Sequence, residues 1–390
     1  MNAPKLRFKE FTDNWENKKL DNFLTESKIK GNTGEKAKKL TVKLWGKGVV
    51  PKQEIYNGSN NTQYYIRKSG QLIYGKLDFL NCAFGIIPSH LDKYESTIDA
   101  PAFDINDMNT SFLINKITQK KFYKKNGDIA DGSRRAKRIN SNIFLDMSIF
   151  VPSLEEQKKI GDFFTLIDEK IDLQTKKIES LEKYKKGLMQ KIFKRELRFK
   201  DELGNDYPEW ETKKLGDICT FFSGGTPSTK NSSYYNGSIP FIRSGEISSY
   251  TTELLLTEEG LNNSSAKLVE KGDLLYALYG ATSGEVSISK INGAINQAIL
   301  CIKSNKINIY FLENILSYNK DNIITKLIQG GQGNLSANLI KSLSYEIPSL
   351  EEQQKISNFL TSIDKKIELE KEKLNNLKLQ KSGFLQKMFI

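Results

Sequence analysis

The densest concentration of positive side chains in this chain is the run KKFYKKNGDIADGSRRAKR at 120–138. Lysine contacts phosphate oxygens as a point charge, and the planar fork of arginine also fits the acceptor edge of guanine. The run is therefore predicted to follow a nucleic-acid backbone and to offer arginines to base edges, the alternative being a solvated charge run. The candidate contact residues are Lys120, Lys121, Lys124, Lys125, Arg134, Arg135, Lys137 and Arg138.

The stretch IQGGQGNLSANL at 328–339 offers different chemistry, because it is rich in glycine and nearly uncharged. Glycines allow the backbone to approach a ligand closely, and the side-chain amides of Gln332 and Asn334 are able to donate to and accept from base edges. A plain turn explains the glycines equally well. If the stretch binds nucleic acid, it recognises the bases through hydrogen bonds rather than through ionic contacts.

A second polar loop, FFSGGTPSTK at 221–230, adds Thr226, Ser228 and Lys230 as candidate contact residues. Arg243, in the run FIRSGE, is either a further candidate reader or a structural ion pair with Glu246. These residues, with those of the two longer stretches, form the predicted DNA-binding set.

An internal repeat must position these stretches. VPSLEEQKKIGDFFTLIDEKI begins at 151 and returns as IPSLEEQQKISNFLTSIDKKI from 347, which is 196 residues later. This period is too long for a solenoid unit, so each repeat is predicted to be a whole domain followed by a helix. The predicted order is a globular block at 1–152, a helix at 153–193, a second block at 194–348 and a second helix at 349–390.

Both helices carry the same start signal and the same apolar phasing. Ser153 precedes Glu156 by three residues, as Ser349 precedes Glu352, and this spacing predicts capping boxes. Apolar residues then recur at alternating steps of four and three, which predicts a coiled-coil seam rather than an ordinary amphipathic surface helix. The seam residues are Ile160, Phe164, Ile167, Ile171, Ile178 and Leu181 in the first helix, and Ile356, Leu360, Ile363, Ile367, Leu374 and Leu377 in the second.

Two seam positions are polar in both copies, Gln174 with Glu370 and Lys185 with Lys381. Their matching placement suggests control of the register, although a solvated position explains it equally well. Because one helix leads out of the first block and the other leads back, the pair is predicted to be antiparallel. The predicted fold class is α+β, with two globular α+β domains separated by two long α-helices that form an antiparallel coiled coil.

The charge balance points to an acidic partner, since the 390 residues carry a net charge of +12. Nearly all of this excess lies at 1–152, with net +10, whereas 194–348 has net −1. Three scattered cysteines fit reduced thiols, and neither an apolar leader nor a long apolar run is present, so a cytoplasmic protein is expected. One histidine, no metal-ligand spacing and no nucleotide-binding loop favour a non-catalytic chain without a metal site.

The repeat as a whole resembles the specificity subunit of type I restriction-modification systems. The similarity rests on PSLEEQ at the start of each helix, and on the second-block runs GGTPS, IPFIRSGEI, KGDLLYALYGATSG and QGNLSANLIKSLSYEIPSLEEQQKI. The first block departs more, because SRRAKRINSNIFLDMSIFVPSLEEQ at 133–157 lacks the glycine-rich loop. The resemblance covers the entire chain.

The resemblance implies a subunit that reads a bipartite, asymmetric target in double-stranded DNA, one half for each target-recognition domain. It also implies two methyltransferase subunits and two restriction subunits, the motor-nucleases, as partners, with no membrane involved. Adenosylmethionine, ATP and Mg are then expected on those partners, and no cofactor on this chain. The alternative is a coiled-coil scaffold without sequence-specific DNA binding, and a nuclease is a more distant one.

Overall fold

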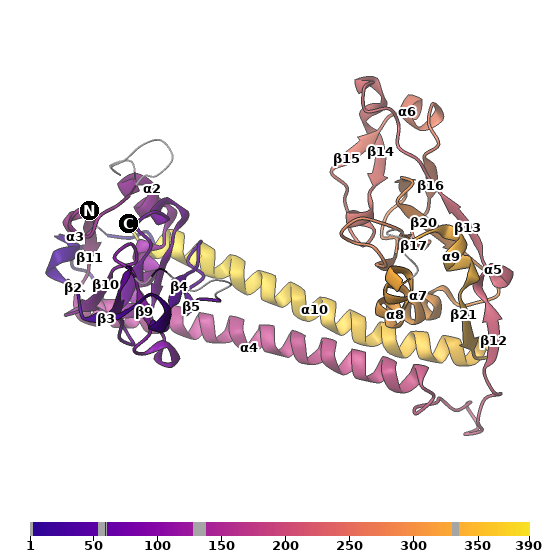
Figure 1. Cartoon of the computed structure of the whole chain (residues 1–390), viewed down its shortest axis with the longest axis horizontal. Coiled ribbons are helices and arrows are strands. Elements are labelled where there is room, and N and C mark those ends of the chain that lie inside the picture. The colour runs from indigo at the N-terminus through magenta and orange to yellow at the C-terminus, as the bar shows by residue number, and fades with distance from the viewer. Residues whose placement is uncertain (1–2, 54–58, 60, 128–137, 330–334) are drawn as a thin grey trace. The chain divides into compact units, whose positions relative to one another are not determined.

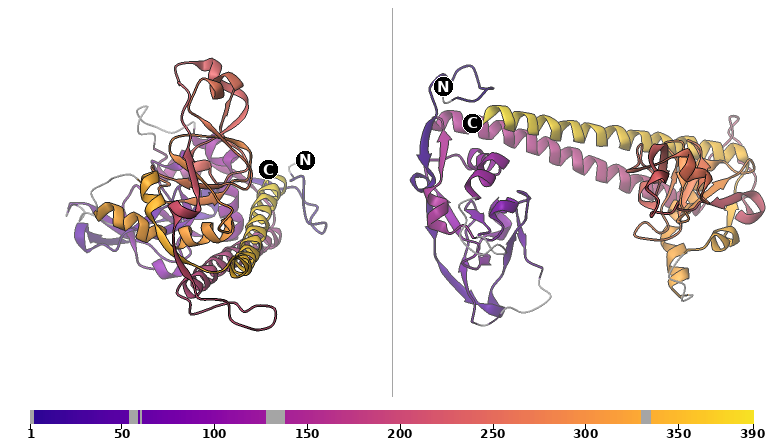
Figure 2. Two further views of the ribbon diagram at one scale, coloured as in Figure 1. Left: turned by 90° about the vertical axis from the view of Figure 1, so that its right-hand side faces the viewer. Right: turned by 90° about the horizontal axis from the view of Figure 1, so that it is seen from above.

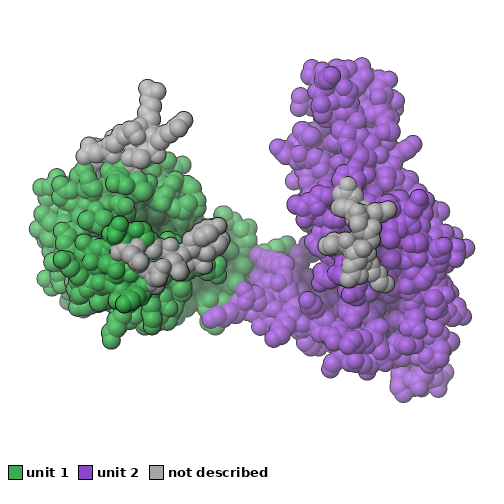
Figure 3. Space-filling view, in the orientation of Figure 1, with its two compact units in different colours: residues 1–175, 372–390 green, residues 176–371 purple. Residues whose placement is uncertain are grey.

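The computed structural model describes residues 3–53, 59, 61–127, 138–329 and 335–390. It divides into two compact units, one made of 1–175 with 372–390 and the other of 176–371 (Figure 3). Each unit joins antiparallel strands to short helices and to parts of two long helices (Figure 1). The predicted α+β class is confirmed.

Unit 1 has its core around a four-stranded antiparallel sheet in the order β2-β10-β7-β8. The centre of this sheet is apolar on both faces, since Leu72, Ile73 and Tyr74 of β7 are all fully buried. A separate antiparallel ribbon pairs β1 with β11 and brings the two ends of the block together. The strands are β1 Glu16–Lys19, β2 Leu24–Ser27, β3 Lys30–Thr33, β4 Leu40–Val42, β5 Val49–Pro51, β6 Gln63–Ile66, β7 Leu72–Tyr74, β8 Phe84–Ile86, β9 Glu95–Ser96, β10 Ala102–Ile105 and β11 Ser148–Val151, and the short helices are α1 Thr110–Ile117, α2 Lys120–Gly127 and α3 Ser141–Asp146.

Unit 2 repeats this plan. Its antiparallel sheet has the order β13-β20-β17-β18, and its ribbon pairs β12 with β21. A further sheet, β15-β14-β19-β16, includes one parallel pair, β14 with β19. The strands are β12 Glu211–Lys214, β13 Thr220–Ser223, β14 Tyr235–Ile242, β15 Leu254–Leu256, β16 Lys267–Val269, β17 Leu274–Ala277, β18 Val286–Ile288, β19 Gly293–Ile295, β20 Ile299–Lys303 and β21 Ser344–Ile347, and the short helices are α5 Leu215–Ile218, α6 Glu258–Asn262, α7 Ile309–Tyr318, α8 Lys320–Gln329 and α9 Ala337–Ser342.

The two long helices are α4, Leu154–Phe193, and α10, Leu350–Met388. In unit 1, Phe163 of α4 contacts Phe384 of α10 with ring centroids 5.1 Å apart, and Asp168 pairs with Lys381 at 2.6 Å. The residue number falls along α10 as it rises along α4, so the helices run antiparallel, and Figure 2 shows the end of α10 beside the start of α4. The predicted antiparallel pairing is confirmed.

Unit 2 repeats this ion pair, because Lys185 of α4 contacts Asp364 of α10 at 2.7 Å. Both lysines are the polar seam residues singled out in the sequence, and each finds a carboxylate on the opposite helix. Glu370 also has a cation across the pair, Lys177 at 3.0 Å. All twelve predicted seam residues are buried or half-buried. The first two of each helix also belong to the core of the adjoining globular block.

The start of each long helix is held by a buried carboxylate. Ser153 and Ser349 cap their helices as predicted, accepting hydrogen bonds from the backbone N–H of Glu156 at 3.4 Å and of Glu352 at 3.3 Å. The Glu156 carboxylate accepts two 2.7 Å hydrogen bonds from Arg7, which lies in the arm that precedes β1. Such a bidentate pair fixes geometry as well as charge, and it ties the arm to the helix.

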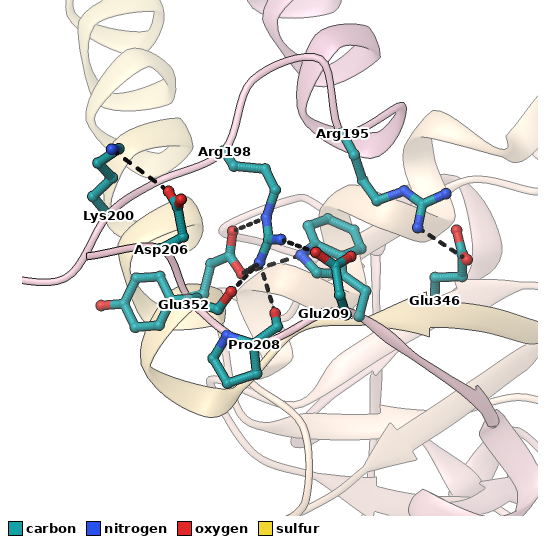
Figure 4. A network of polar contacts seen from close by, with 10 residues as sticks. Arg195, Arg198, Lys200, Asp206, Pro208, Glu209, Glu346 and Glu352 are labelled. Carbon is teal, nitrogen blue, oxygen red and sulfur yellow. Dashed lines mark hydrogen bonds and ion pairs between the residues drawn. The ribbon is translucent and has the colours of Figure 1, made fainter. Parts of the chain in front are cut away.

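In unit 2 the equivalent carboxylate has a larger network (Figure 4). Glu352 is fully buried and accepts hydrogen bonds from Arg198, at 2.9 and 3.3 Å, and from the indole N–H of Trp210 at 3.1 Å. Arg198 also donates to the carbonyl oxygens of Tyr207 and Pro208. Its carboxylate contacts raise the pKa of Arg198, so the guanidinium stays charged.

Candidate nucleic-acid interface

The two stretches predicted to read DNA join the fold at equivalent points. In unit 1 the N–H of Ile139, just after the basic run, donates to the carbonyl of Lys76 at 3.1 Å. In unit 2 the N–H of Leu335, two residues after the last glycine of the glycine-rich stretch, donates to the carbonyl of Leu278, also at 3.1 Å. Lys76 and Leu278 follow the equivalent strands β7 and β17, so Ile139 and Leu335 join the fold at the same edge of the equivalent sheets.

Five predicted contact residues cannot be placed at this edge. Arg134, Arg135, Lys137, Gln332 and Asn334 lie outside the described residues. Their contacts with DNA stay predictions.

The lysines that open the basic run lie on α2. Phe122 and Tyr123 are buried in the core of unit 1 and anchor this helix. The remaining side chains leave the core, so all four predicted lysines, Lys120, Lys121, Lys124 and Lys125, are exposed. An anchored helix with a cationic outer face suits phosphate contacts better than a freely moving run does.

Lys76 is a candidate that the sequence reasoning missed. Its stem is buried, with 8% of the residue exposed, and this burial lowers the pKa of its ammonium group. The carboxylates of Glu26 and Asp99 act in the opposite direction and raise this pKa. Arg138, which directly precedes Ile139, is a charged neighbour and pairs with Asp99 at 3.7 Å. The available signal was a lysine two residues after the end of a strand of buried residues.

The loop at 221–230 is shaped by two close approaches of its backbone. A Cβ atom on Gly224 would lie 1.8 Å from the carbonyl oxygen of Ile295, and one on Gly225 would lie 1.9 Å from the Ser265 Oγ. Only glycine fits such contacts. The loop therefore presents its predicted contact residues Thr226, Ser228 and Lys230 on the surface, where all three are exposed.

Polar side chains from a neighbouring turn extend this surface. The exposed Gln297 contacts the Thr226 hydroxyl at 2.7 Å and also hydrogen-bonds to the Tyr279 side chain. Burial raises the pKa of Tyr279, so its phenol stays protonated and able to donate. The nearby Thr282 hydroxyl is buried without a hydrogen-bond partner in the described part of the chain. Gln297 and Tyr279 were not predicted as contact residues, because Thr226, Tyr279 and Gln297 come from separate segments that meet only in the folded unit.

Arg243 is engaged by carboxylates of its own unit. It contacts Glu246 at 3.0 Å and also forms an ion pair with Glu253. These two contacts raise the pKa of Arg243, as expected for a cation that is stabilised by adjacent anions. The ion-pair alternative therefore describes this side chain, and its reading of a base stays a prediction.

Neither a membrane segment nor a metal cluster is found in the described residues. No helix there combines the length and apolar character needed to cross a bilayer. No three His, Cys, Asp or Glu side chains there gather closely enough to hold a metal ion. The three cysteines are free and buried.

Comparison with known proteins places this geometry in a family. A family model described as the type I restriction modification DNA specificity domain matches residues 207–379. The putative type I restriction enzyme MjaX specificity subunit of Methanocaldococcus jannaschii is 30% identical over 285 residues, which cover 68% of this chain and 64% of that protein. The MjaVIII specificity subunit of the same organism is 29% identical and covers 62% of this chain and 61% of that protein. The chain thus matches less than two thirds of the length of these relatives.

Solved structures share the whole fold. The S subunit of a type I restriction-modification system from M. genitalium aligns over 100% of this chain and 99% of its own, with a TM-score of 0.62 at 15% identity. A chain from a study of complex assembly and conformational transition in a type I restriction-modification system aligns over 96% and 97%, with a TM-score of 0.56 at 17% identity. Repeat, fold and sequence matches agree, and the chain belongs to the family of type I restriction-modification specificity subunits.

Proposed function

We propose that this chain is a sequence-specific DNA-binding subunit that reads a bipartite, asymmetric target, one half for each unit. One observation supports the proposal: the residues that follow two stretches of different chemistry, Ile139 and Leu335, bond to the chain at equivalent points, the carbonyl of Lys76 in unit 1 and the carbonyl of Leu278 in unit 2. The two units have the same sheet but differ in the stretch that would contact DNA. Each unit would therefore approach DNA in the same way and recognise a different sequence. An asymmetric target follows from that difference.

The two units would use different physical contacts. Unit 1 contains the strongly basic block and would supply most of the phosphate contacts, through the exposed lysines of α2 and the loop that follows it. Unit 2 would rely on hydrogen bonds from Thr226, Gln297, Tyr279 and the glycine-rich loop. Phosphate contacts position a protein on DNA, whereas contacts with base edges determine the sequence that it prefers.

The chemistry of restriction and methylation would belong to other subunits. We propose that the chain is not catalytic and that it assembles with two methyltransferase and two restriction subunits, which bind adenosylmethionine, ATP and Mg. The antiparallel helix pair is its extended non-globular part and the candidate surface for the methyltransferase subunits. The family membership supports this assignment.

Selection from a randomised duplex library tests the proposal, using the full chain together with its methyltransferase partner. The expected result is an enriched motif with two specified segments, different in sequence, separated by unspecified bases. Binding without any enriched motif would contradict sequence reading and favour the scaffold alternative. Metal-dependent cleavage by the chain alone would favour the nuclease alternative.

The lysines of α2 should dominate the salt dependence of DNA binding. Changing Lys120, Lys121, Lys124 and Lys125 together to Gln should flatten the plot of log K against log salt, by about 0.9 for each phosphate that the variant no longer neutralises. The measurement is DNA affinity by fluorescence anisotropy at several salt concentrations.

A matched control removes the same charge elsewhere. Lys170, Lys183, Lys365 and Lys366 are exposed residues of the long helices, and their change to Gln should leave the slope nearly unchanged. Equal slopes for the α2 variant and the unaltered chain would show that the α2 lysines are only solvated.

A further inference from the structure

The β4–β5 hairpin of unit 1 carries an exposed tryptophan at its tip. The turn between the two strands is closed by the N–H of Lys43, which donates to the carbonyl of Gly48 at 2.8 Å. Trp45 lies within this turn and is 58% exposed, whereas only 1% of Trp15 and 8% of Trp210 are exposed. Of the three tryptophans, Trp45 is therefore the one that a ligand can reach.

The backbone at Trp45 is unfavourable for a residue of this size. Its φ angle of +62° lies in the left-handed region, which glycine adopts freely and asparagine adopts more readily than bulky residues do. A side chain buried in the core could offset this strain, but the indole is mostly exposed. Residues strained in this way gather at binding sites, where function rather than folding accounts for them. Folding of the hairpin therefore does not explain a tryptophan at this position.

Backbone hydrogen bonds fix the position of the tip. The N–H of Trp45 donates to the Asn81 carbonyl, and the N–H of Gly46 donates to the Cys82 carbonyl, both at 2.8 Å. Gly46 also lies close to Thr118, since a Cβ atom added to it would be 3.5 Å from the Thr118 Cγ2. The indole thus extends from a well-held backbone, so that little conformational entropy would be lost when it contacts a ligand.

The same contacts connect the tip to α2, the helix with the candidate phosphate-binding lysines. Thr118 is two residues before the first residue of α2. The segment Phe79–Asn81, to which the Trp45 N–H is bonded, packs against α2, and a Cβ atom on Gly127 would lie 2.2 Å from the Leu80 Cδ2. The tip of the hairpin and α2 therefore contact the same short segment of unit 1.

The chain on both sides of Trp45 is basic. Residues 36–52 contain six lysines and no Asp or Glu. Lys43 and Lys47, which flank Trp45, are both exposed. Lysine is depleted at protein–protein interfaces, whereas surfaces that bind DNA are much more positively charged. An exposed aromatic ring between two exposed lysines therefore fits DNA better than it fits a protein partner.

We propose that Trp45 contacts the bases of the half-site that unit 1 reads, with Lys43 and Lys47 on the phosphates beside it. An aromatic side chain stacks on a base, or packs against the methyl group of thymine, and apolar side chains in DNA grooves enter between base steps in this way. The inference rests on the proposed function. It assigns base contacts in unit 1 to a side chain outside the basic run at 120–138.

Trp45→Asn tests this contact, because asparagine tolerates the left-handed backbone and the change removes the indole without altering the charge. In the full chain with its methyltransferase partner, the variant should bind a duplex with the selected target about tenfold more weakly, the scale of one lost stacking contact with a base. Its affinity for a duplex of unrelated sequence should change by less than about twofold. The slope of log K against log salt should stay the same, since no phosphate contact is removed.

Two controls separate a DNA contact from a structural role. Leu203→Ala removes an apolar side chain of unit 2 that is 87% exposed, and its affinity for the target should stay within about twofold of that of the unaltered chain. Thermal unfolding of the Trp45→Asn variant should occur at the same temperature as in the unaltered chain or at a higher one, because a strained residue is replaced. A lower temperature would show that the indole stabilises the fold, and it would overturn the proposal.

Repeating the DNA selection with the Trp45→Asn variant identifies the bases concerned. One segment of the motif should lose base preference, and the other should keep it. Unchanged affinity for the target, or an equal loss on the target and the unrelated duplex, would overturn the proposal. Weaker assembly with the methyltransferase in place of weaker DNA binding would also overturn it, because the indole would then contact a protein. These outcomes differ from failure of the proposed function, in which the unaltered chain enriches no motif.

Discussion

A fragment of residues 1–193, which contains only the first of the two repeats, should form a symmetric dimer. In the dimer, each copy should supply the helix that the second repeat supplies in the full chain. Unit 1 is completed by the end of α10, where Phe389 lies against Trp15 and Phe112 with ring centroids 6.3 and 5.3 Å away. Phe193 is the corresponding residue of α4, 196 positions earlier. In the fragment, the end of α4 from a second copy should therefore occupy the position of α10.

The repeated ion pair would also allow a second copy of α4 to replace α10 along the length of the helix pair. Asp168 pairs with Lys381 in unit 1, and Lys185 pairs with Asp364 in unit 2. Asp364 and Lys381 are the second copies of Asp168 and Lys185. The first repeat thus carries both members of the pair, and two antiparallel copies of α4 should join Asp168 of each to Lys185 of the other. Isologous pairing of this kind is the commonest route to a dimer.

Light scattering at micromolar concentration measures the dimer, and a charge swap tests its geometry. Asp168→Lys should weaken dimerisation by roughly tenfold, because two modest attractions per dimer become repulsions. Adding Lys185→Asp to that variant should restore the affinity. A monomeric fragment, or equal affinities for the single and double variants, would contradict this pairing.

Glu352→Ala should destabilise unit 2 by about 3–5 kcal/mol, because removing one member of a buried ion pair leaves the other uncompensated. Arg198 would lose its carboxylate, and the indole N–H of Trp210 would lose its acceptor. Glu352→Gln should be milder, since its amide oxygen still accepts from Trp210. The Glu352 side chain has no exposed surface, so water does not replace its hydrogen bonds in the variant.

Hydrogen exchange resolved by peptide provides the measurement, because two units need not unfold in a single transition. Faster exchange is expected at 197–215 and at the start of α10, and little change within unit 1. Glu351→Ala, an exposed neighbour on the same turn, is the matched control. Unchanged exchange at 197–215 in the Glu352→Ala variant would show that this network does not hold the arm to the helix.

The repeated helices and the fold class were predictable from the sequence because their signals are local and occur twice. Helix periodicity needs only neighbouring residues, and two copies with one phase made mutual pairing the simplest interpretation. Even the polar seam lysines, Lys185 and Lys381, were identified, although their carboxylate partners lie on the opposite helix. Glu156 and Glu352 were singled out as members of capping boxes, but their bonds to Arg7 and Arg198, which join segments about 150 residues apart, were not predicted.

The candidate interface was less accessible to sequence reasoning. The α2 lysines were found because they are adjacent in the chain, whereas Gln297 and Thr226 meet only through the fold of unit 2. Lys76 gave no compositional signal, since its environment comes from the end of a buried strand. The break between α7 and α8 also depends on a side chain, because α7 ends at Tyr318 and the Asn319 amide donates a 2.8 Å hydrogen bond to the Ile315 carbonyl.

Footprinting of the selected duplex tests most directly the claim that two different readers share one chain. The full chain with its methyltransferase partner should protect two segments separated by an accessible gap. The variant with Lys120, Lys121, Lys124 and Lys125 changed to Gln should lose protection of one segment first as salt rises, while the other persists. One continuous footprint, or equal weakening of both segments, would contradict the account.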